Sequence, residues 1–261
     1  SFAPMLVRIV LKSEEALAFS FLNAFVVGIA LERNMTIVSF VFLSSLIASY
    51  CVRKVMTRTR VVIAGIYTGI ANVAMAIVIA FYLEELSLEN LQYFILFPFI
   101  HGILSSLIVS VLAPVAESIF GYATDMKLLE YANLNHPLLR ELMVQTPGTY
   151  HHSVIIGSMV EAAAEEISAN SLLARVGSYY HDIGKSKNSQ YFTENQQGYN
   201  RHDKLTPTMS VLVIKAHVKD GIEMAKHHRL PKPIMDMIPM HHGTKLISYF
   251  YYKAKKIQET D

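Results

Sequence analysis

Residues 174–187 read ARVGSYYHDIGKSK and place a histidine directly before an aspartate, His181–Asp182. Gly184 and Lys185 follow closely. Glycine commonly ends a helix, so one interpretation is a charged helix end closed by Gly184. The other is a pair of metal ligands, because imidazole and carboxylate both bind transition metals. The stretch alone leaves both interpretations open, so the rest of the chain must decide.

The composition divides the 261-residue chain into two unlike parts. Residues 1–120 hold nearly all the long apolar runs, whereas residues 121–261 are charged and contain ten of the eleven histidines. The net charge of +2 argues against a protein that binds nucleic acid polymers through a basic face. The single cysteine, Cys51, excludes an intrachain disulfide and a cysteine-rich zinc site. We therefore expect one domain in residues 1–120 and a second in residues 121–261.

Four apolar segments in the first part are as long as the roughly 17–25 residues that a helix needs to cross a bilayer. They are residues 15–31, 35–52, 61–83 and 93–119, and the second and third carry no charge. Buried helices of a large soluble core are the alternative. Four such segments in succession instead predict a multi-pass region within a lipid bilayer.

The loops between these segments differ in charge. The loop between the second and third segments is basic through Arg53, Lys54, Arg58 and Arg60. Residues 84–92, between the third and fourth, contain no Lys or Arg. The positive-inside rule places the basic loop in the cytoplasm, together with Arg8 and Lys12, and four crossings then bring the second domain into the cytoplasm. The opening SFAPMLVRIVLK lacks an initiator methionine, so we expect further segments before it.

The second part is predicted to be all-helical, because its apolar residues recur at helical spacing and no convincing alternating strand is present. The expected helices cover residues 124–143, 150–167, 171–184, 207–228 and 231–242. Pro147–Gly148 is expected to break the chain before the second of these, and Asn170 to start the third. A polar loop, residues 185–205, precedes the fourth.

Histidines and aspartates in this part form a set of candidate metal ligands. They are His151–His152, His181–Asp182, His202–Asp203, His217, His227–His228 and His241–His242. Two metals close together require a carboxylate that bridges them, and an adjacent His–Asp pair can supply it.

Taken singly, most of these residues have an ordinary structural explanation. His151–His152, on an apolar-faced helix, is more often a hydrogen-bonded core feature. His227–His228 resembles an exposed basic helix end, and His202–Asp203 a loop feature with Asp203 as a candidate cap. Together, however, several histidines at the helix ends of one domain favour a metal site.

The order of these residues resembles the HD superfamily of metal-dependent phosphohydrolases. Whole phrases share the resemblance: PGTYHHSVIIGSMVEAAAE (147–165), ARVGSYYHDIGK (174–185) and HHGTKLISYFYYKA (241–254). They are similar to the seven-transmembrane HD hydrolases of bacteria, the PgpH-type cyclic di-AMP phosphodiesterases. The apolar part fits the last transmembrane helices of that family, so the expected fold is a transmembrane helical region followed by an all-helical cytoplasmic HD domain.

The resemblance implies the metal ligands of this chain. They are His152, His181, Asp182, His217, His241 and His242, and Asp182 is implied to bridge two ions. A later aspartate of the family would fall beyond Asp261, so we expect one ligand outside this sequence. Histidine-rich ligation favours divalent manganese or iron over magnesium, which prefers oxygen ligands.

Phosphodiester hydrolysis follows from such a site. Two divalent ions about 3.5–4 Å apart stabilise the charge of the transition state and lower the pKa of a water between them. Asp182 would hold both ions, and Lys185 would place its ammonium against the scissile phosphate unless it is a solvated surface lysine. Tyr179, Tyr180 and Tyr191 are candidates for stacking on a base, and Tyr180 is the one we assign to substrate binding.

The function implied by the resemblance is hydrolysis of cyclic di-AMP to pApA at the bacterial plasma membrane. A phosphodiesterase for cyclic di-GMP or another nucleotide is an alternative, although the Gly-Tyr-Pro motif of the cyclic di-GMP branch is not apparent after His242. A receptor that binds a nucleotide without turnover is another, and a transporter with a regulatory domain ranks last because paired intramembrane charges are lacking. The oligomeric state stays open, with a homodimer as one candidate.

Overall fold

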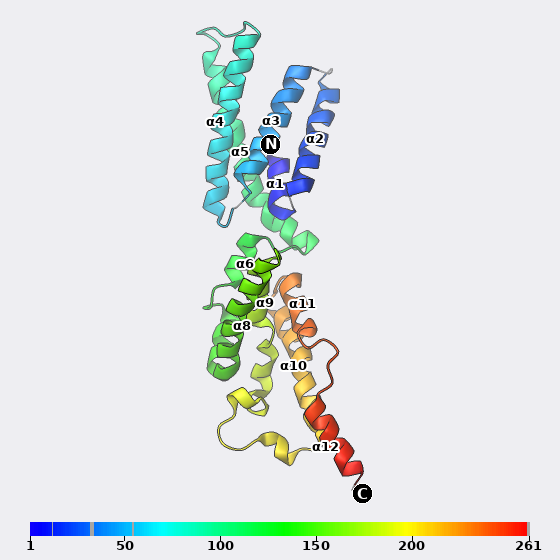
Figure 1. The fold of residues 1–261 in the computed structure, drawn as a ribbon. Coiled ribbons are helices and arrows are strands. Elements are labelled where there is room, and N and C mark those ends of the chain that lie inside the picture. The colour runs from blue at the N-terminus through cyan, green and yellow to red at the C-terminus, as the bar shows by residue number, and fades with distance from the viewer. Residues whose placement is uncertain (12, 32–33, 54, 260–261) are drawn as a thin grey trace. The chain divides into compact units, whose positions relative to one another are not determined.

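The computed structural model describes residues 1–11, 13–31, 34–53 and 55–259, and every regular element within these ranges is a helix (Figure 1). The predicted all-α class is therefore confirmed. The chain divides into two compact units, Ser1–Met126 and Lys127–Asp261.

The first unit contains the apolar helices. Its described helices are α1 (Phe2–Val10), α2 (Ser13–Ala30), α3 (Met35–Cys51), α4 (Arg58–Tyr82) and α5 (Leu91–Phe120). By length and composition α2, α4 and α5 can each cross a membrane, whereas α3 is a shorter apolar helix of 17 residues. At a rise of 1.5 Å per residue α3 is about 25 Å long, slightly less than the ~30 Å of a bilayer core. The four predicted apolar segments are thus all helical, and α1 is an additional short helix that the sequence did not predict.

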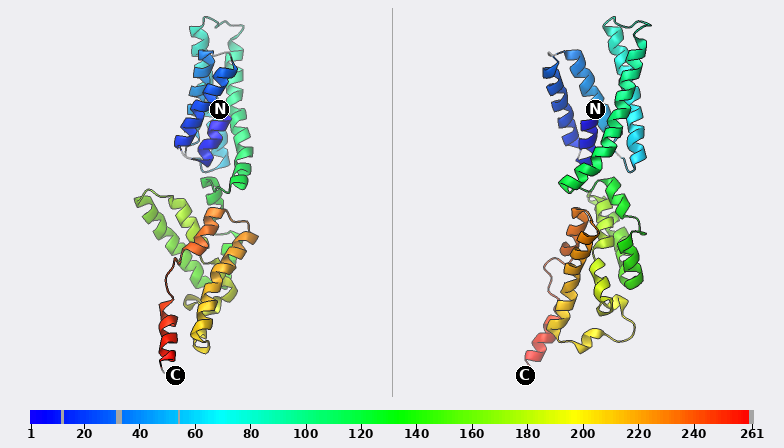
Figure 2. Two further views of the ribbon diagram at one scale, coloured as in Figure 1. Left: turned by 90° about the vertical axis from the view of Figure 1, so that its right-hand side faces the viewer. Right: turned by 180° about the vertical axis from the view of Figure 1, so that it is seen from behind.

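Helices α4 and α5 lie side by side and approach each other through small residues (Figure 2). A Cβ atom added at Gly102 would lie 2.3 Å from the backbone nitrogen of Gly69, and one added at Gly65 would lie 2.1 Å from Ser106 Oγ. Within lipid there is no hydrophobic effect to drive the association of helices, so transmembrane helices associate through close packing. Small residues make this close approach possible. The α4–α5 pair therefore has the packing expected of a membrane hairpin.

The surface of this unit is apolar where a soluble protein would be polar. Phe21, Phe25 and Ile29 follow one face of α2 at a spacing of four residues, and each is more than half exposed. Large exposed apolar faces of this kind mark contact with lipid or with a partner. Three candidate membrane-spanning helices and this surface indicate a membrane-anchored protein.

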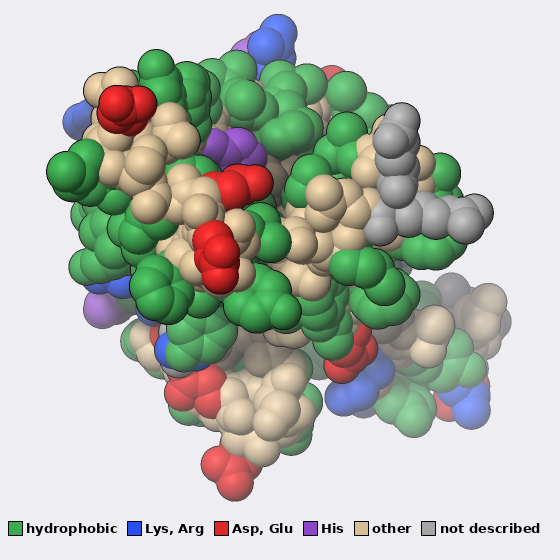
Figure 3. Space-filling view, turned by 90° about the horizontal axis from the view of Figure 1, so that it is seen from above, with side chains coloured by type: hydrophobic (Ala, Val, Ile, Leu, Met, Phe, Trp, Pro, Cys, Tyr) green, Lys and Arg blue, Asp and Glu red, His purple; other side chains and the backbone are tan. Residues whose placement is uncertain are grey.

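The charged residues of this unit gather at its ends. Arg53, Arg58 and Arg60 lie at or before the start of α4, whereas its far end leads into the acidic turn that contains residues 84–90. Figure 3 looks onto that far end, where acidic side chains stand among hydrophobic ones. Lys12 and Lys54, which the sequence also assigns to the basic side, lie outside the described residues.

The second unit is a bundle of short helices joined by 3₁₀ turns. Its α-helices are α6 (Asp125–Tyr131, which begins at the unit boundary), α7 (Pro137–Gln145), α8 (Pro147–Glu166), α9 (Ser171–Tyr180), α10 (Pro207–His227), α11 (Lys232–Met240) and α12 (Ser248–Gln258). Its 3₁₀ helices are η1 (Ile183–Tyr191), η2 (Thr193–Asn195) and η3 (Arg201–Lys204). The core holds fully buried Leu138, Val176, Ile183 and Ile234, which come from four different elements.

Two expectations for this unit were wrong. The helix predicted at residues 124–143 is interrupted between α6 and α7, where the Asn133 side chain accepts a hydrogen bond from the Asn135 amide at 3.0 Å and Pro137 opens α7. Pro147 and Gly148 do not lie in a break between two helices. Helix α7 ends at Gln145, and Pro147 is the first residue of α8, a position where proline loses no helical hydrogen bond. The expected start at Asn170 is confirmed, since its side chain accepts from the Leu173 amide at 2.9 Å.

Candidate metal centre

The histidines that the family resemblance implies as ligands meet around Asp182, which follows the last turn of α9. His152 comes from α8, and His217 from α10. Two overlapping groups have ligand atoms within 4.8 Å of one another: His152, His181 and Asp182 form one, and Asp182, His217, His241 and His242 form the other. Asp182 is the residue that both groups share.

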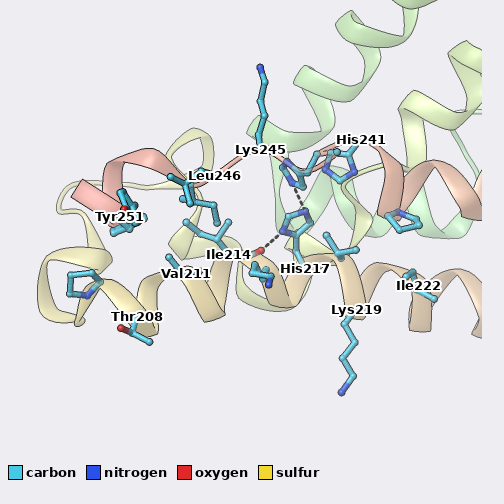
Figure 4. A pocket seen from close by; sticks show the side chains of 18 of the residues that line it. Thr208, Val211, Ile214, His217, Lys219, Ile222, His241, Lys245, Leu246 and Tyr251 are labelled. Carbon is cyan, nitrogen blue, oxygen red and sulfur yellow. Dashed lines mark hydrogen bonds between the residues drawn. The ribbon is translucent and has the colours of Figure 1, made fainter. Parts of the chain in front are cut away.

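The carboxylate of Asp182 lies between imidazole nitrogens on both sides. His181 Nε2 is 3.0 Å from Asp182 Oδ2, whereas His217 Nε2 and His241 Nε2 are 3.5 and 3.4 Å from Oδ1. His242 Nε2 lies 3.1 Å from His217 Nε2 (Figure 4). Each side of the carboxylate therefore has its own set of nitrogen donors.

Backbone carbonyls fix the orientation of three of these rings. His181 Nδ1 lies 2.6 Å from Ser178 O, and His241 Nδ1 lies 2.7 Å from Ile238 O. His217 Nδ1 makes the same contact with Ile214 O. A carbonyl only accepts hydrogen bonds, so Nδ1 carries the proton in each ring and Nε2 of a neutral ring is left with its lone pair. This is the arrangement in which proteins present histidine to a metal.

Asp182 Oδ1 shows that a cation fits this site. The side chain is 3% exposed, and within the described part of the chain Oδ1 is buried with no hydrogen-bond partner. It faces the Nε2 atoms of His217 and His241, which offer lone pairs when the rings are neutral. A buried oxygen without a donor is costly, and a metal ion coordinated by these nitrogens and this oxygen would satisfy all of them. Nitrogen and carboxylate donors together suit a divalent transition metal.

The electrostatics keep Asp182, His217 and His242 in their metal-binding forms, whereas for His181 burial is outweighed by the contact with Asp182 and its charge, which raise the pKa of His181. Burial alone would raise the pKa of Asp182, but the neighbouring His181 and His241 side chains and the charge of Lys185 outweigh burial and hold this pKa well below its usual range. Burial, reinforced by neighbouring histidines, lowers the pKa of His242 to about 4. Burial also lowers the pKa of His217. At neutral pH these groups are therefore a carboxylate and two neutral imidazoles.

Lys185 is part of the same cluster. Its ammonium nitrogen is 2.7 Å from Asp182 Oδ2 and 2.8 Å from Glu194 Oε1, and its side chain is only 13% exposed. It also lies 5.0 Å from the centre of the Phe192 ring. Burial opposes its charge, but the two carboxylates outweigh burial and raise its pKa. The alternative of a solvated surface lysine is therefore wrong.

The structure corrects the assignment of Tyr180 to substrate binding. Tyr180 is fully buried, and its hydroxyl donates to Tyr131 O at 2.9 Å. Tyr179 is also buried, and its ring fills the space beside Gly157. Neither ring can stack on a base, because both already pack inside the domain.

Gly184 also has a different role from the one considered in the sequence. Helix α9 ends at Tyr180, and Gly184 lies within η1 rather than in the left-handed conformation of a helix terminator. A Cβ atom at this position would lie 1.9 Å from His217 O. Glycine is required here because η1 and α10 touch backbone to backbone beside the candidate metal ligands.

The remaining histidine pairs lie outside the ligand groups. His202 is buried, with Nε2 2.8 Å from Tyr191 O, and Asn200 rather than Asp203 caps η3. His227 is exposed at the end of α10, as its basic surroundings predicted. His151 is exposed beside His152 and belongs to neither group of ligand atoms.

A cavity of about 1230 Å³ adjoins the centre and shares His217, His241 and His242 with it. Its walls come from α10, the segment after α11, and α12, and its apolar faces include Ile214, Leu246 and Tyr251. Lys219 and Lys245 stand at its edges and extend away from the cavity (Figure 4). Small-molecule sites usually occupy ~300–1,000 Å³, so this cavity has room for a dinucleotide.

Glu194 and Thr149 are site residues that sequence reasoning missed. Glu194 lies in the polar loop predicted to be irregular, and Thr149 lies three residues before His152. Neither belongs to a metal-ligand pattern, and only the folding of η2 against α8 brings them to Lys185.

Each part of the chain matches a known protein family. Residues 149–260 match the HD domain family, and residues 1–124 match the family described as a 7TM receptor with intracellular HD hydrolase. The chain is similar to the cyclic-di-AMP phosphodiesterase PgpH of Listeria monocytogenes, with 38% identity over 98% of this chain and 36% of that protein. It is 40% identical to the PgpH protein of Bacillus subtilis over 88% of this chain and 32% of that protein.

A solved structure is also similar. The crystal structure of the L. monocytogenes PgpH HD domain in complex with cyclic-di-AMP is 53% identical to the matched part, which covers 48% of this chain and 59% of that one, with a TM-score of 0.46. The chain spans about a third of the length of the two curated relatives it matches. The two parts of the chain thus match, in order, the family described as a 7TM receptor with intracellular HD hydrolase and the HD domain family.

Proposed function

We propose that this protein is a membrane-anchored, metal-dependent phosphodiesterase that hydrolyses cyclic di-AMP to linear pApA. The observation that carries the proposal is the buried Oδ1 of Asp182, which has no hydrogen-bond partner among the described residues and faces two imidazole nitrogens beside a cavity of dinucleotide size. The names of its two relatives from Listeria and Bacillus support the choice of substrate.

Two divalent ions of the manganese or iron type would occupy the two groups of ligands, with Asp182 common to both. Such ions would supply charge stabilisation at the phosphate and would lower the pKa of the attacking water. The chain's own residues fix the geometry, because the carbonyl contacts at Nδ1 prevent the imidazoles of His181, His217 and His241 from turning away.

Lys185 has a separate role in this reaction. Water adds to phosphorus, the bond from phosphorus to the 3′ oxygen breaks, and the 3′ oxygen leaves as a hydroxyl after it takes up a proton. The phosphate thereby gains negative charge on its non-bridging oxygens. The ammonium of Lys185, 2.7 Å from the shared carboxylate, is placed to stabilise that charge.

The cavity would hold the rest of the nucleotide. The scissile phosphate would lie at the end formed by His217 and His242, and an adenine base would lie against the apolar faces of Leu246 and Tyr251. These two side chains are 62% and 50% exposed, so a planar base would cover apolar surface that is otherwise in contact with water.

The orientation in the membrane follows from charge. Arg53, Arg58 and Arg60 lie at one end of α4 and the acidic turn at the other, so the positive-inside rule places the basic end in the cytoplasm. We propose that residues 1–120 form the membrane region of a bacterial plasma-membrane protein and that residues 121–261 form its cytoplasmic HD domain.

The test is to reconstitute the chain in nanodiscs, load it with Mn²⁺, and follow cyclic di-AMP and cyclic di-GMP by chromatography. We expect pApA from cyclic di-AMP and at least tenfold slower turnover of cyclic di-GMP, since each tenfold preference needs only about 1.4 kcal/mol of differential binding. Nucleotide binding without hydrolysis at full metal occupancy would favour the receptor alternative and contradict the enzyme.

A further inference from the structure

A line of short polar contacts runs outward from the metal centre to the first turn of α8. Lys185 Nζ connects Asp182 Oδ2 and Glu194 Oε1 at 2.7 and 2.8 Å. Glu194 Oε1 also accepts from Thr149 Oγ1 at 3.0 Å. Thr149 in turn accepts from Asn195 Nδ2 at 2.8 Å and donates its amide to Asn195 Oδ1 at 3.2 Å. The contacts link η1, η2 and α8, the helix that carries His152.

Water is excluded from the line at Asp182 and Thr149, whereas Glu194 is its more exposed member. The side chain of Asp182 is 3% exposed, that of Lys185 is 13% exposed and that of Glu194 is 30% exposed. Thr149 is fully buried. Burial reduces the solvent screening of the ion pairs, so these charges affect one another more strongly than surface pairs do.

Backbone contact holds η2 in place as well. A Cβ atom at Gly148 would lie 2.0 Å from Glu194 O, so the chain at Glu194 touches the chain at the start of α8. The carboxylate of Glu194 is therefore held at a fixed place from two sides, by the backbone contact at Gly148 and by the hydroxyl of Thr149.

The charges explain why a second carboxylate is needed. Asp182 and Lys185 alone form a neutral pair, and the ammonium would compete with a metal ion for the carboxylate that both groups of ligands share. Glu194 adds a negative charge and a second partner for the ammonium. The three groups then carry a net charge of −1, and Lys185 keeps a partner when Asp182 binds metal.

We propose that Glu194 is a positioning residue that holds the Lys185 ammonium at the edge of the metal centre, keeps it from neutralising Asp182, and through Thr149 ties it to the helix of His152. Glu194 acts through Lys185 and touches neither metal nor substrate. The inference rests on the proposed metal-dependent function, and its main test is metal affinity, which can be measured without turnover.

The first experiment measures Mn²⁺ binding to the full chain in nanodiscs by electron paramagnetic resonance. Glu194→Gln keeps the shape of the side chain and removes its charge. Loss of a group that supports metal ligands usually costs ~10- to 100-fold in affinity, and we expect a loss in that range.

The matched control is Glu161→Gln, because Glu161 also forms a half-buried ion pair between two elements, at 2.8 Å from Arg175. If the Mn²⁺ affinity of Glu194→Gln lies within about twofold of that of Glu161→Gln, the proposal is wrong. Glu194 would then act as an ordinary ion pair, which contributes under ~1 kcal/mol to stability.

A double-mutant cycle tests whether Glu194 acts through Lys185. In a Lys185→Met background the ammonium is gone, so adding Glu194→Gln should change the Mn²⁺ affinity by less than about twofold. An undiminished loss in that background would show that Glu194 affects the metal by another route and would contradict the assignment.

Thr149 gives a second test that keeps the charge of Glu194. Thr149→Val removes the hydroxyl at nearly constant volume and should weaken Mn²⁺ binding, whereas Thr149→Ser retains the hydroxyl and should restore it. If Glu194→Gln fails to fold, as judged by circular dichroism, this pair decides the question, and equal affinities in Val and Ser variants would overturn the proposal.

The outcomes separate this inference from the proposed function. A wild-type chain that binds Mn²⁺ but hydrolyses no cyclic di-AMP would contradict the function, and the Glu194 variants would still be judged by their affinities. A wild-type chain that binds no Mn²⁺ would overturn both.

Discussion

At the scale of single residues, the centre depends on which nitrogen of each histidine carries the proton. The Nδ1 contacts of His181, His217 and His241 all reach a carbonyl three residues earlier in the chain. For His181 and His241, which directly follow α9 and α11, the helix end supplies such carbonyls without any further side chain, because its last carbonyls lack partners within the helix. His217 makes the same contact from the middle of α10.

Asp182 is the residue on which the centre depends most. Asp182→Asn keeps the size of the side chain and removes the charge that both groups of ligands share, so Mn²⁺ affinity should fall by more than the ~100-fold that loss of a supporting group costs. Isothermal titration calorimetry of the full chain would measure it. The second His–Asp pair offers a control: Asp203 is exposed, and Asp203→Asn should bind Mn²⁺ as the wild type does.

Variants of two tyrosines distinguish a structural contact from a contact with the substrate. Tyr180→Phe removes the hydrogen bond to Tyr131 O and should lower the free energy of unfolding by about 1 kcal/mol without changing KM for cyclic di-AMP. Tyr251→Ala, at the wall of the cavity, should raise KM with little effect on stability. Denaturant unfolding and steady-state kinetics distinguish the two, and a raised KM in Tyr180→Phe would restore the substrate-binding role that burial excludes.

At the scale of elements, the centre depends on the close contact of η1 with α10. Gly184→Ala would place a methyl group against His217 O and the Gly221 backbone, and overpacking of this kind costs ~1–3 kcal/mol. We expect lower stability and, because His217 moves, weaker Mn²⁺ binding. Gly198→Ala serves for comparison, since its φ is +98° but no atom lies within 4 Å of the added Cβ, so only stability should change. Unchanged metal affinity in Gly184→Ala would mean that the contact does not position His217.

The elements also show what the sequence can predict. The apolar segments at α2 to α5 were predictable because length and hydropathy alone define a membrane helix, whereas the nine residues of α1 are too few to be recognised in this way. The candidate ligands that meet around Asp182 were named through the resemblance to the HD family, because the His–Asp pattern alone left other interpretations open. Glu194 was not predictable, since its partners lie 9 and 45 residues away and meet it only through tertiary packing.

At the scale of the whole molecule, the two units face different solvents. The first unit exposes large apolar side chains along its helices, whereas the second has a buried core and brings five histidines together around Asp182.

The orientation can be tested with single cysteines in a Cys51→Ser background. Ser87→Cys lies in the acidic turn, and Thr57→Cys lies at the basic end of α4; both positions are exposed. In intact cells a membrane-impermeant maleimide should label the first and not the second, because the positive-inside rule places them on opposite sides. Labelling in the reverse pattern would place the HD domain outside the cytoplasm.

The most direct test of the account is the metal dependence of turnover in the full chain. Wild-type protein in nanodiscs should convert cyclic di-AMP to pApA, lose this activity after chelation, and regain it when Mn²⁺ is added, with half-saturation at the concentration that calorimetry gives for metal binding. Turnover that persists after complete removal of metal, or that never appears at full occupancy of the Asp182 centre, would contradict it.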